Sequence, residues 1–290
     1  STQDVYPLNE YDFFIFSDYP SRRQRKILKL KKGHYLVLFE SEIIRPDNWQ
    51  KGNHQYFKKV FTWHDGLVDQ KKYLKYYWPN KISSRINFNL NKKEKLSVLI
   101  AGNKKNKDFR ELYSERIRAI RWFEANHPQD FDLYGIGWEK RALNWSWPFS
   151  IVLNQIELFK TAFFQKFSSY QGPVENKRET LEKYKFCICY ENAQNIPGYI
   201  TEKILDCFFA GCVPVYLGAP NILDFIPQNT FIDKNQFKTY DELYDFMDKM
   251  PEQEYLTYLN NISAYLKSEK IRFFSAQKFV KTIVENITDK

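Results

Sequence analysis

The sequence predicts an α/β fold built from two Rossmann-like domains, and three observations support this fold class. Short apolar runs of strand length recur along the chain, and stretches with helical apolar spacing separate them. This alternation occurs in both halves, as is typical of parallel sheets covered by helices. A lysine-rich interval that ends in NLNKKEK (89–95) divides the two series. We therefore expect an N-terminal domain over residues 1–94 and a C-terminal domain over residues 95–271.

In the N-terminal domain, short apolar runs predict strands at residues 12–16 (DFFIF), 34–40 (HYLVLFE) and 60–63 (VFTW). A basic stretch, RRQRKILKLKK (22–32), lies between the first two strands. We expect it to form a helix with a solvated basic face and with Ile27, Leu28 and Leu30 turned inward.

In the C-terminal domain, LSVLIAG (96–102) and FDLYG (131–135) predict strands, and a helix is expected between them over residues 108–126. Three further helices are expected at residues 239–250, 254–266 and about 273–286. Residues 141–170 hold aromatic clusters and apolar residues at helical spacing. We expect them to pack as an insertion, with an acceptor-binding or membrane-contacting role as the alternative.

The segment 184–220 combines a strand, a polar loop, a helix and a second strand. KFCICY (185–190) and VPVYLG (213–218) have the length and composition of buried strands. Thr201 is placed to cap the intervening helix and Gly211 to end it. In such a βαβ unit, ligands bind at the carboxyl end of the first strand and the amino end of the helix.

The polar residues at this edge have the chemistry of a nucleotide-sugar site. A helix N-terminus favours phosphate, and a cation and hydrogen-bond donors are added by Lys203, Tyr199 and Asn192. Glu202 repels phosphate but suits a neutral diol such as a ribose. The alternative is a capping arrangement in which Glu202 stabilises the helix start and Lys203 is solvated. Neither a Walker A motif nor GxGxxG is present, which argues against a nucleoside triphosphatase or a dinucleotide site.

The same segment resembles the donor-binding motif of the α1,3-fucosyltransferases, a family of inverting enzymes that use GDP-fucose. The matching stretches are YKF (184–186), YEN (190–192), GYITEKI (198–204) and PVYLGAP (214–220). The resemblance implies the GT-B fold, in which two Rossmann-like domains face each other across a cleft. It implies that the final helix, here about 272–290, crosses back to the first domain. It also implies that Glu202 binds ribose and that three residues face the diphosphate: Tyr199, Lys203 and Asn192.

An inverting sugar transfer requires a base that removes the proton from the acceptor hydroxyl. The stretch LVLFESEIIRP (36–46) places Glu40 and Glu42 at the carboxyl end of a predicted strand. The resemblance implies that Glu40 is this base. Glu42 is the runner-up, because both side chains point to one side if the strand continues. For either residue, the alternative is an ordinary carboxylate at the end of a surface strand.

The resemblance also implies an arginine near the diphosphate, from the first helix of the C-terminal domain. Arg110 and Arg116 are both candidates, since a guanidinium binds phosphate through two hydrogen bonds. No DxD motif occurs at the expected place, so we expect no obligatory metal cofactor and at most stimulation by a divalent ion. His64 in FTWHDG is a lesser candidate for lining the acceptor side, and a polar turn residue is its alternative.

The chain carries a formal net charge of +9, which suits a phosphorylated ligand, anionic lipid or nucleic acid. The basic clusters lack interleaved aromatics and a recognised motif, so we expect no nucleic-acid partner, whereas peripheral membrane contact stays open. No apolar run is long enough to span a bilayer. Four cysteines without CxxC spacing are expected in the core and not in a zinc site. A bacterial cytoplasm is the expected location, with the Golgi lumen as the alternative if the sequence is part of a eukaryotic enzyme.

Together these features predict an inverting fucosyltransferase that moves L-fucose from GDP-fucose to a hydroxyl, expected to be O3, of GlcNAc or glucose. The acceptor implied by the resemblance is a glycan of lactosamine or lactose type. One alternative is a non-catalytic glycan- or nucleotide-binding protein of the same fold, against which the presence of Glu40 argues. Another is a basic nucleic-acid binder, whose affinity would fall steeply with salt.

Overall fold

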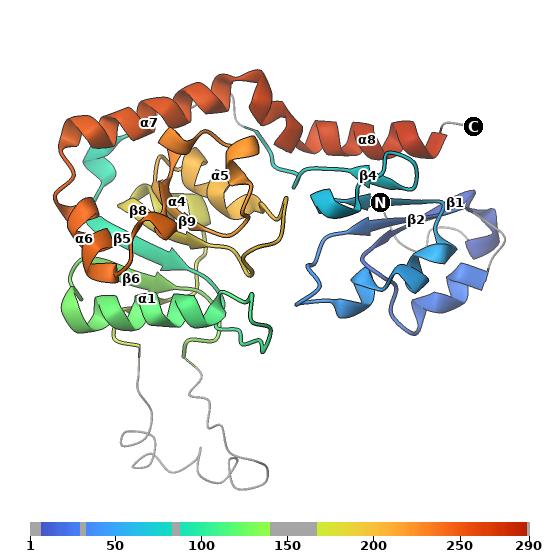
Figure 1. Ribbon diagram of the computed structural model, residues 1–290, viewed down its shortest axis with the longest axis horizontal. Helices are drawn as coiled ribbons and strands as arrows, with labels where there is room; N and C mark the ends of the chain where they lie inside the picture. The colour runs from blue at the N-terminus through green and yellow to red at the C-terminus, as the bar shows by residue number, and fades with distance from the viewer. Residues whose placement is uncertain (1–6, 30–32, 83–87, 140–166, 289–290) are drawn as a thin grey trace, which may run out of the picture.

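The computed structural model describes residues 7–29, 33–82, 88–139 and 167–288, which form two lobes, each built on a parallel β-sheet (Figure 1). We call residues 7–76 together with the last helix the N-terminal lobe, and the described part of residues 88–274 the C-terminal lobe. The chain passes between the lobes twice, and the two connecting segments lie side by side. Asn80 N–H donates to the Phe274 carbonyl at 2.7 Å, and Ala276 N–H donates to the Asn80 carbonyl at 2.9 Å. The predicted α/β fold class is confirmed.

The N-terminal lobe holds four parallel strands in the order β1-β2-β3-β4. Their bounds are β1 Phe13–Ser17, β2 Gly33–Leu38, β3 Lys59–Thr62 and β4 Tyr73–Lys75. The first three are the predicted strands, whereas β4 is three residues long and its sequence, YLK, carries no strand pattern. In the described residues, the connections between these strands contain short 3-10 helices at Gln24–Lys29, Pro46–Trp49, Lys51–Tyr56 and Asp65–Leu67. The helix expected over 22–32 is therefore corrected to a 3-10 segment, in which Ile27 and Leu28 do pack inward.

The C-terminal lobe holds six parallel strands in the order β10-β9-β8-β5-β6-β7. Their bounds are β5 Lys95–Ile100, β6 Phe131–Tyr134, β7 Tyr170–Gly172, β8 Tyr184–Tyr190, β9 Val213–Leu217 and β10 Ile232–Asp233. The strand order runs outward in both directions from the adjacent pair β5 and β8. Helix α1 (Tyr113–Asn126), which follows β5, lies on one face of the sheet, and α5 (Glu202–Phe209), which follows β8, lies on the other (Figure 1). In such a doubly wound sheet, ligands bind at the carboxyl ends of the two central strands.

The remaining described helices are α4 Lys177–Glu182, α6 Tyr240–Asp248, α7 Glu252–Lys267 and α8 Ala276–Thr288. Helix α6 packs on α1, where the rings of Trp122 and Tyr240 stack with centroids 5.9 Å apart. Helix α8 runs along the N-terminal lobe (Figure 1), and its Phe279 packs against Phe39 and Tyr76. The chain thus ends on the lobe in which it begins.

The helix expected over residues 108–126 begins only at Tyr113. Asp108 accepts the backbone N–H of Arg110 at 2.9 Å, and this turn holds the preceding residues outside the helix. As a result, Arg110 lies on a loop and Arg116 on the helix. The segment expected as an insertion, 141–170, falls largely on residues 140–166, which lie outside the described residues.

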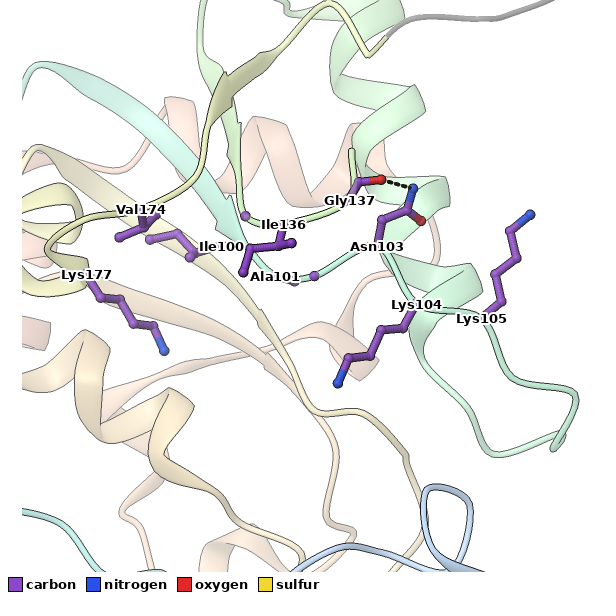
Figure 2. A pocket seen from close by; sticks show the side chains of 11 residues that line it. Ile100, Ala101, Asn103, Lys104, Lys105, Ile136, Gly137, Val174 and Lys177 are labelled. Carbon is purple, nitrogen blue, oxygen red and sulfur yellow. Dashed lines mark hydrogen bonds between the residues drawn. The ribbon is translucent and has the colours of Figure 1, made fainter. Parts of the chain in front are cut away.

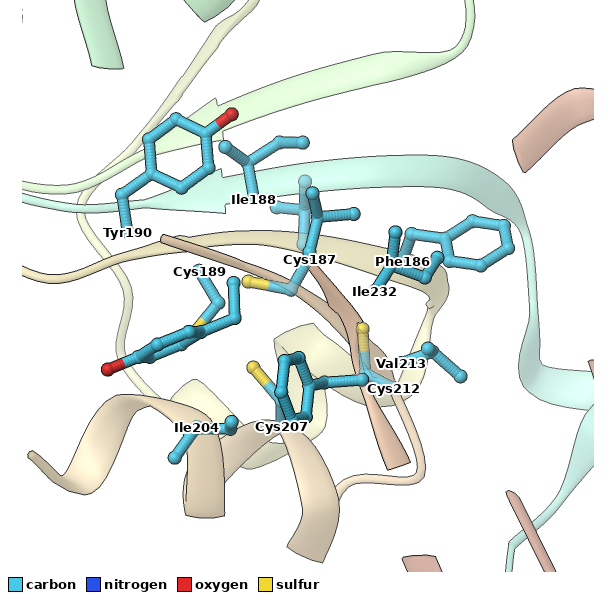
Figure 3. Packing of buried hydrophobic residues seen from close by; sticks show 14 of the residues in the cluster. Phe186, Cys187, Ile188, Cys189, Tyr190, Ile204, Cys207, Cys212, Val213 and Ile232 are labelled. Carbon is cyan, nitrogen blue, oxygen red and sulfur yellow. The ribbon is translucent and has the colours of Figure 1, made fainter. Parts of the chain in front are cut away.

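The four cysteines lie where β8 and β9 pack on α5 (Figure 3). All four, Cys187, Cys189, Cys207 and Cys212, are buried and free, so the predicted core role is confirmed. Burial raises the pKa of Cys212 to about 12, which keeps this thiol protonated. No helix among the described residues is long and apolar enough to cross a membrane.

Candidate active site

The carboxyl ends of β5 and β6 border a cavity of about 810 Å³ in the C-terminal lobe (Figure 2). Its walls come from the loops that follow these two strands and from the segment that leads into α4. Gly135 has a φ of +133°, and a Cβ there would lie 1.9 Å from the Ala101 carbonyl oxygen, so only glycine fits where the loops meet. Asn103 ties the loops together by donating to the Gly137 carbonyl at 3.0 Å. The cavity lies at the carboxyl edge of the sheet, beside the central strand β5 and on the side away from β8, and its volume suits a nucleotide.

Three lysines line the cavity: Lys104 and Lys105 from the loop after β5, and Lys177 from the opposite side (Figure 2). Lys177 pairs with Asp206 of α5 at 2.6 Å, so its charge is already balanced. Lys104 is exposed and forms no ion pair with a residue in the described ranges. It is therefore the cation that an anionic ligand would meet first. Lys104 belongs to the basic cluster NKKNK (103–107), which matches no known motif and so did not identify it as a site residue.

Glu191, at the end of β8, is a fully buried carboxylate that holds the start of α5. It accepts the Thr201 backbone N–H at 2.8 Å, the Thr201 hydroxyl at 2.8 Å and the Lys203 ammonium at 2.9 Å. A buried carboxylate requires such partners to offset the loss of water. Lys203, predicted to face a diphosphate, is thus occupied in part by this internal ion pair. The role of Glu191 was not predictable from the sequence, because its partner Lys203 lies on a different element and the pairing depends on the fold.

Arg116 and Asn192 join α1 to the end of β8. One guanidinium nitrogen of Arg116 donates to the carbonyls of Tyr190 and Glu191, at 2.6 and 2.7 Å, and to the Asn192 side-chain oxygen at 3.1 Å. Arg116 is only 4% exposed, and burial lowers its pKa. The Asn192 amide in turn donates to the Tyr199 hydroxyl at 3.3 Å. These contacts position the loop and leave Arg116 turned toward backbone carbonyls.

Residues 193–199 leave the C-terminal lobe and pack into the N-terminal lobe. Ala193, Ile196 and Tyr199 are buried in an apolar cluster with residues of β2, β3 and α8. The Tyr199 ring lies 4.7 Å from that of Trp63, centroid to centroid, and burial raises its pKa. Gly198 has a φ of +80°, and a Cβ there would lie 2.4 Å from the Trp63 carbonyl oxygen. The loop assigned by resemblance to the diphosphate therefore also joins the lobes.

Arg110 makes a second link between the lobes. It forms an ion pair with Glu42 of the N-terminal lobe and another with Asp108 at 2.8 Å. The hydrogen bond to Asp108, followed by that to Glu42, raises the pKa of Arg110. Strand β2 ends at Leu38, so Glu40 and Glu42 do not continue a strand as the sequence analysis assumed.

Glu40 differs from Glu42 because its carboxylate forms no hydrogen bond with any residue that the structure describes. It is half-buried, and burial, followed by the charge of Asp18, raises its pKa. The charges of Lys104 and Lys203 lower that pKa, which places Glu40 near the carboxyl edge of the C-terminal sheet. Glu202, in the first turn of α5, is likewise half-buried without a described hydrogen-bond partner, and its charge acts on Glu40. Two carboxylates without a described hydrogen-bond partner thus lie within range of each other's charge, one from each lobe.

His64 lies at the end of β3 and caps a short 3-10 helix. Its Nδ1 accepts the Gly66 backbone N–H at 3.0 Å, and its ring stacks on Trp63. These contacts match the polar turn role that was its expected alternative.

Comparison with known proteins shows a similarity that is concentrated in the C-terminal half of the chain. Residues 152–283 match the family described as Glycosyltransferase family 10 (fucosyltransferase) C-term. An alpha-(1,3)-fucosyltransferase FucT of Helicobacter pylori is 37% identical over 125 residues, 40% of this chain and 26% of that protein. The 4-galactosyl-N-acetylglucosaminide 3-alpha-L-fucosyltransferase 9 of Mus musculus is 31% identical over 124 residues, 40% of this chain and 34% of that protein. The match thus spans about a quarter to a third of these relatives.

Solved structures share the whole arrangement of the chain. The crystal structure of an alpha1,3-fucosyltransferase is 18% identical and covers 98% of this chain and 80% of its own, with a TM-score of 0.55. An alpha-glucosyltransferase in complex with UDP and a 13-mer DNA is 12% identical and covers 98% of this chain and 81% of its own, with a TM-score of 0.60. At these identities the likeness establishes the fold, which is the GT-B arrangement of two α/β lobes. Residues 152–283 are therefore similar to the C-terminal part of the glycosyltransferase family 10 (fucosyltransferase) proteins, and the chain has the GT-B fold.

Proposed function

We propose that this protein transfers L-fucose from GDP-fucose to a sugar hydroxyl, expected to be O3 of GlcNAc or glucose, in a glycan of lactosamine or lactose type. The observation that carries the proposal is the uncommitted carboxylate of Glu40, beside the carboxyl edge of a lobe that is similar to the family 10 proteins. The family match supports fucose as the transferred sugar. A structural neighbour solved with GDP-fucose supports the donor.

In the proposed reaction, Glu40 takes the proton of the acceptor hydroxyl as that oxygen forms a bond to C1 of fucose. The bond between C1 and the β-phosphate oxygen breaks, and GDP leaves with one additional negative charge. Attack from the face opposite the leaving phosphate inverts the anomeric centre. Because its pKa is raised, Glu40 is a stronger base than an ordinary glutamate.

We assign the nucleotide to the cavity at the ends of β5 and β6. Glu202 lies close enough for its charge to act on Lys177 of that cavity, which supports its role as the acceptor of the two ribose hydroxyls. Lys104 and the N-terminus of α5 supply positive potential for the diphosphate. Of the residues that the resemblance placed on the diphosphate, we propose that Asn192, Tyr199 and Lys203 act largely by holding the loop in place.

Of the two arginines, we propose that Arg110 meets the diphosphate. It is partly exposed, lies on a loop between the lobes and is paired with carboxylates that an incoming phosphate can replace. Arg116 is buried and donates hydrogen bonds to two backbone carbonyls and to the Asn192 side chain, so we propose that it positions Asn192.

We propose that no metal is obligatory, because a helix N-terminus and cations can balance the leaving diphosphate. Among the residues that the structure describes, no group of three or more His, Cys, Asp or Glu is arranged to hold a metal ion. Transfer should therefore persist in excess EDTA, and complete loss that added Mg²⁺ or Mn²⁺ restores would refute this part of the proposal.

Peripheral contact with an anionic membrane is proposed from the charge distribution. Residues 1–94 contain 18 basic and 10 acidic residues, against 26 and 25 in the rest of the chain. The 3-10 helix Gln24–Lys29 and its approach expose five cations with no described ion pair: Arg22, Arg23, Arg25, Lys26 and Lys29. Sedimentation with vesicles containing phosphatidylglycerol should show binding that is absent with phosphatidylcholine vesicles. Equal binding to both, or none, would contradict it.

The central experiment is a panel of sugar acceptors incubated with GDP-fucose and analysed by mass spectrometry. We expect a deoxyhexose to be added to lactosamine- or lactose-type acceptors, and no transfer from UDP-glucose. A protein that binds GDP but modifies no acceptor would favour the non-catalytic alternative.

A further inference from the structure

Asp18 links the ends of two neighbouring strands in the N-terminal lobe. It follows β1 directly and has a φ of +63°, in the left-handed region that Asp and Asn tolerate better than most residues. Its Oδ1 accepts the backbone N–H groups of Phe39 at 2.7 Å and Glu40 at 3.1 Å. The same oxygen accepts the Asn48 amide at 2.6 Å. Asp18 thus fixes the main chain on the amino side of Glu40 by hydrogen bonds.

The carbonyl of Glu40 is held as well. It accepts the indole N–H of Trp49 at 3.0 Å and the Asn48 amide at 3.3 Å. Asn48 is fully buried, and its side-chain oxygen accepts the Tyr19 backbone N–H at 2.6 Å. Both peptide groups of Glu40 are therefore fixed, while its carboxylate has no hydrogen-bond partner in the described residues.

This arrangement replaces the support that a strand would give. Strand β2 ends at Leu38, so no ladder hydrogen bond fixes Glu40. A base must be held close to its productive geometry, and a shift of about 1 Å can cost roughly 10²-fold in rate. We propose that Asp18 is a positioning residue that aims Glu40 at the acceptor hydroxyl, an inference that rests on the proposed function.

Asp18 also acts through its charge. The charged groups around Glu40 are Asp18 and Arg45 from its own lobe and Lys104, Lys203 and Glu202 from the C-terminal lobe. The charge of Glu40 also acts on the phenol groups of three tyrosines: Tyr76, Tyr113 and Tyr199. After burial, Asp18 is the largest contribution that raises the pKa of Glu40. Removing its charge should therefore lower that pKa and shift the acid limb of kcat/KM to lower pH.

A matched control lies in the same lobe. Asp69 also accepts three hydrogen bonds on one oxygen, all of them from backbone N–H groups, of Lys71, Lys72 and Tyr73, at 2.8 to 2.9 Å. It makes no contact with Glu40. If Asp18 were only a turn-stabilising residue, loss of the Asp69 carboxylate would have the same effect on turnover as loss of the Asp18 carboxylate.

The test compares Asp18→Gly, Asp18→Asn and Asp69→Gly in the full chain, with kcat, its pH profile, GDP affinity and melting temperature measured for each. Glycine keeps the positive φ, so Asp18→Gly removes the carboxylate without backbone strain. We expect Asp18→Gly to lower kcat about 10- to 100-fold with GDP affinity unchanged. Asn retains an oxygen acceptor, so Asp18→Asn should keep most of kcat and show the acid limb at lower pH. Asp69→Gly should lower the melting temperature without changing kcat.

The inference is overturned if Asp18→Gly keeps the wild-type kcat, or if Asp69→Gly loses as much. It is also overturned if Asp18→Asn leaves the acid limb in place and fails to rescue kcat. If the proposed function is wrong, the wild-type protein itself will transfer no fucose. This outcome is distinct from any that overturns the role of Asp18 alone.

Discussion

Glu40 and Glu191 each lie just past the carboxyl end of a parallel strand, one in each lobe, yet their surroundings are opposite. Glu191 is fully buried, and hydrogen bonds from Thr201 and Lys203 saturate its carboxylate. Glu40 is half-buried, and hydrogen bonds fix its main chain and leave its carboxylate without a described partner. A saturated buried charge holds structure, whereas a fixed residue with an unsatisfied carboxylate is available for chemistry.

The same contrast separates the other candidates. Glu42 is neutralised by Arg110, and Lys203 by Glu191, whereas Glu202 and Lys104 have no described ion-pair partner. We therefore expect Glu42 and Glu191 to affect mainly stability, and Glu202 and Lys104 to affect substrate binding and turnover.

The largest expected effect is on turnover in Glu40→Gln. Loss of a general base should lower kcat by about 10²- to 10⁴-fold, because glutamine cannot take the acceptor proton. GDP affinity, measured by calorimetry, should stay within about twofold, since Glu40 does not bind the nucleotide. Glu42→Gln is the matched control and should retain far more activity. If both variants lost the same activity, the assignment of Glu40 as the base would be contradicted.

Glu191→Ala should produce the largest loss of stability. Removing one member of a buried ion pair typically costs about 3–5 kcal/mol, and we expect the lower part of that range because the Lys203 side chain is 20% exposed. Urea unfolding measures the change. The surface pair Lys92–Glu182 provides the control, because Lys92→Ala should cost about 1 kcal/mol or less. Similar losses in the two variants would show that the Glu191 network does not hold the start of α5.

Glu202→Ala should abolish the thermal stabilisation that GDP gives the wild-type protein. Hydrogen bonds to a charged group are worth about 1.5–3 kcal/mol, which corresponds to roughly 10- to 150-fold weaker binding. Glu254, an exposed acid in the first turn of α7, supplies the control, since Glu254→Ala should leave the GDP shift unchanged. A full GDP shift in Glu202→Ala would remove this residue from the donor site.

The smallest expected effect is a pH shift in Lys104→Ala. Lys104 lowers the pKa of Glu40, so its removal should raise that pKa and protonate the base at higher pH. The acid limb of kcat/KM should therefore move to higher pH, opposite to its movement in Asp18→Asn. Lys105→Ala is the control, because Lys105 belongs to the same loop but is not among the charges that act on the pKa of Glu40. An acid limb that does not move in Lys104→Ala would show that Lys104 does not face Glu40.

Periodicity in the sequence was sufficient for the buried strands and the amphipathic helices, because each needs several apolar residues at fixed spacing. It failed for β4, β7 and β10, which are two or three residues long, and for α4, whose sequence KRETLE holds one apolar residue. These elements owe their conformation to neighbours that are distant in the chain.

A sequence motif predicted which residues lie at this edge of the sheet. It did not predict the role of a residue whose role depends on its hydrogen-bond or ion-pair partner. Whether Arg110 or Arg116 is buried depends on the carbonyls at the end of β8, which lie more than 70 residues away in the chain. Lys203 has the expected position, but its partner Glu191 is visible only in three dimensions. Local sequence therefore predicted which polar residues lie at the β8–α5 edge of the sheet, and it left open which of their charges are paired with one another.

The central claim is that Glu40 acts as a base on the acceptor and forms no covalent bond to fucose. An NMR time course of GDP-fucose with a lactosamine acceptor tests it most directly, because the anomeric proton of the transferred fucose reports its configuration. We expect a fucosylated product whose anomeric configuration is opposite to that of the donor, with GDP released in equal amount. A product with the donor's configuration, or release of GDP and free fucose without transfer, would contradict it.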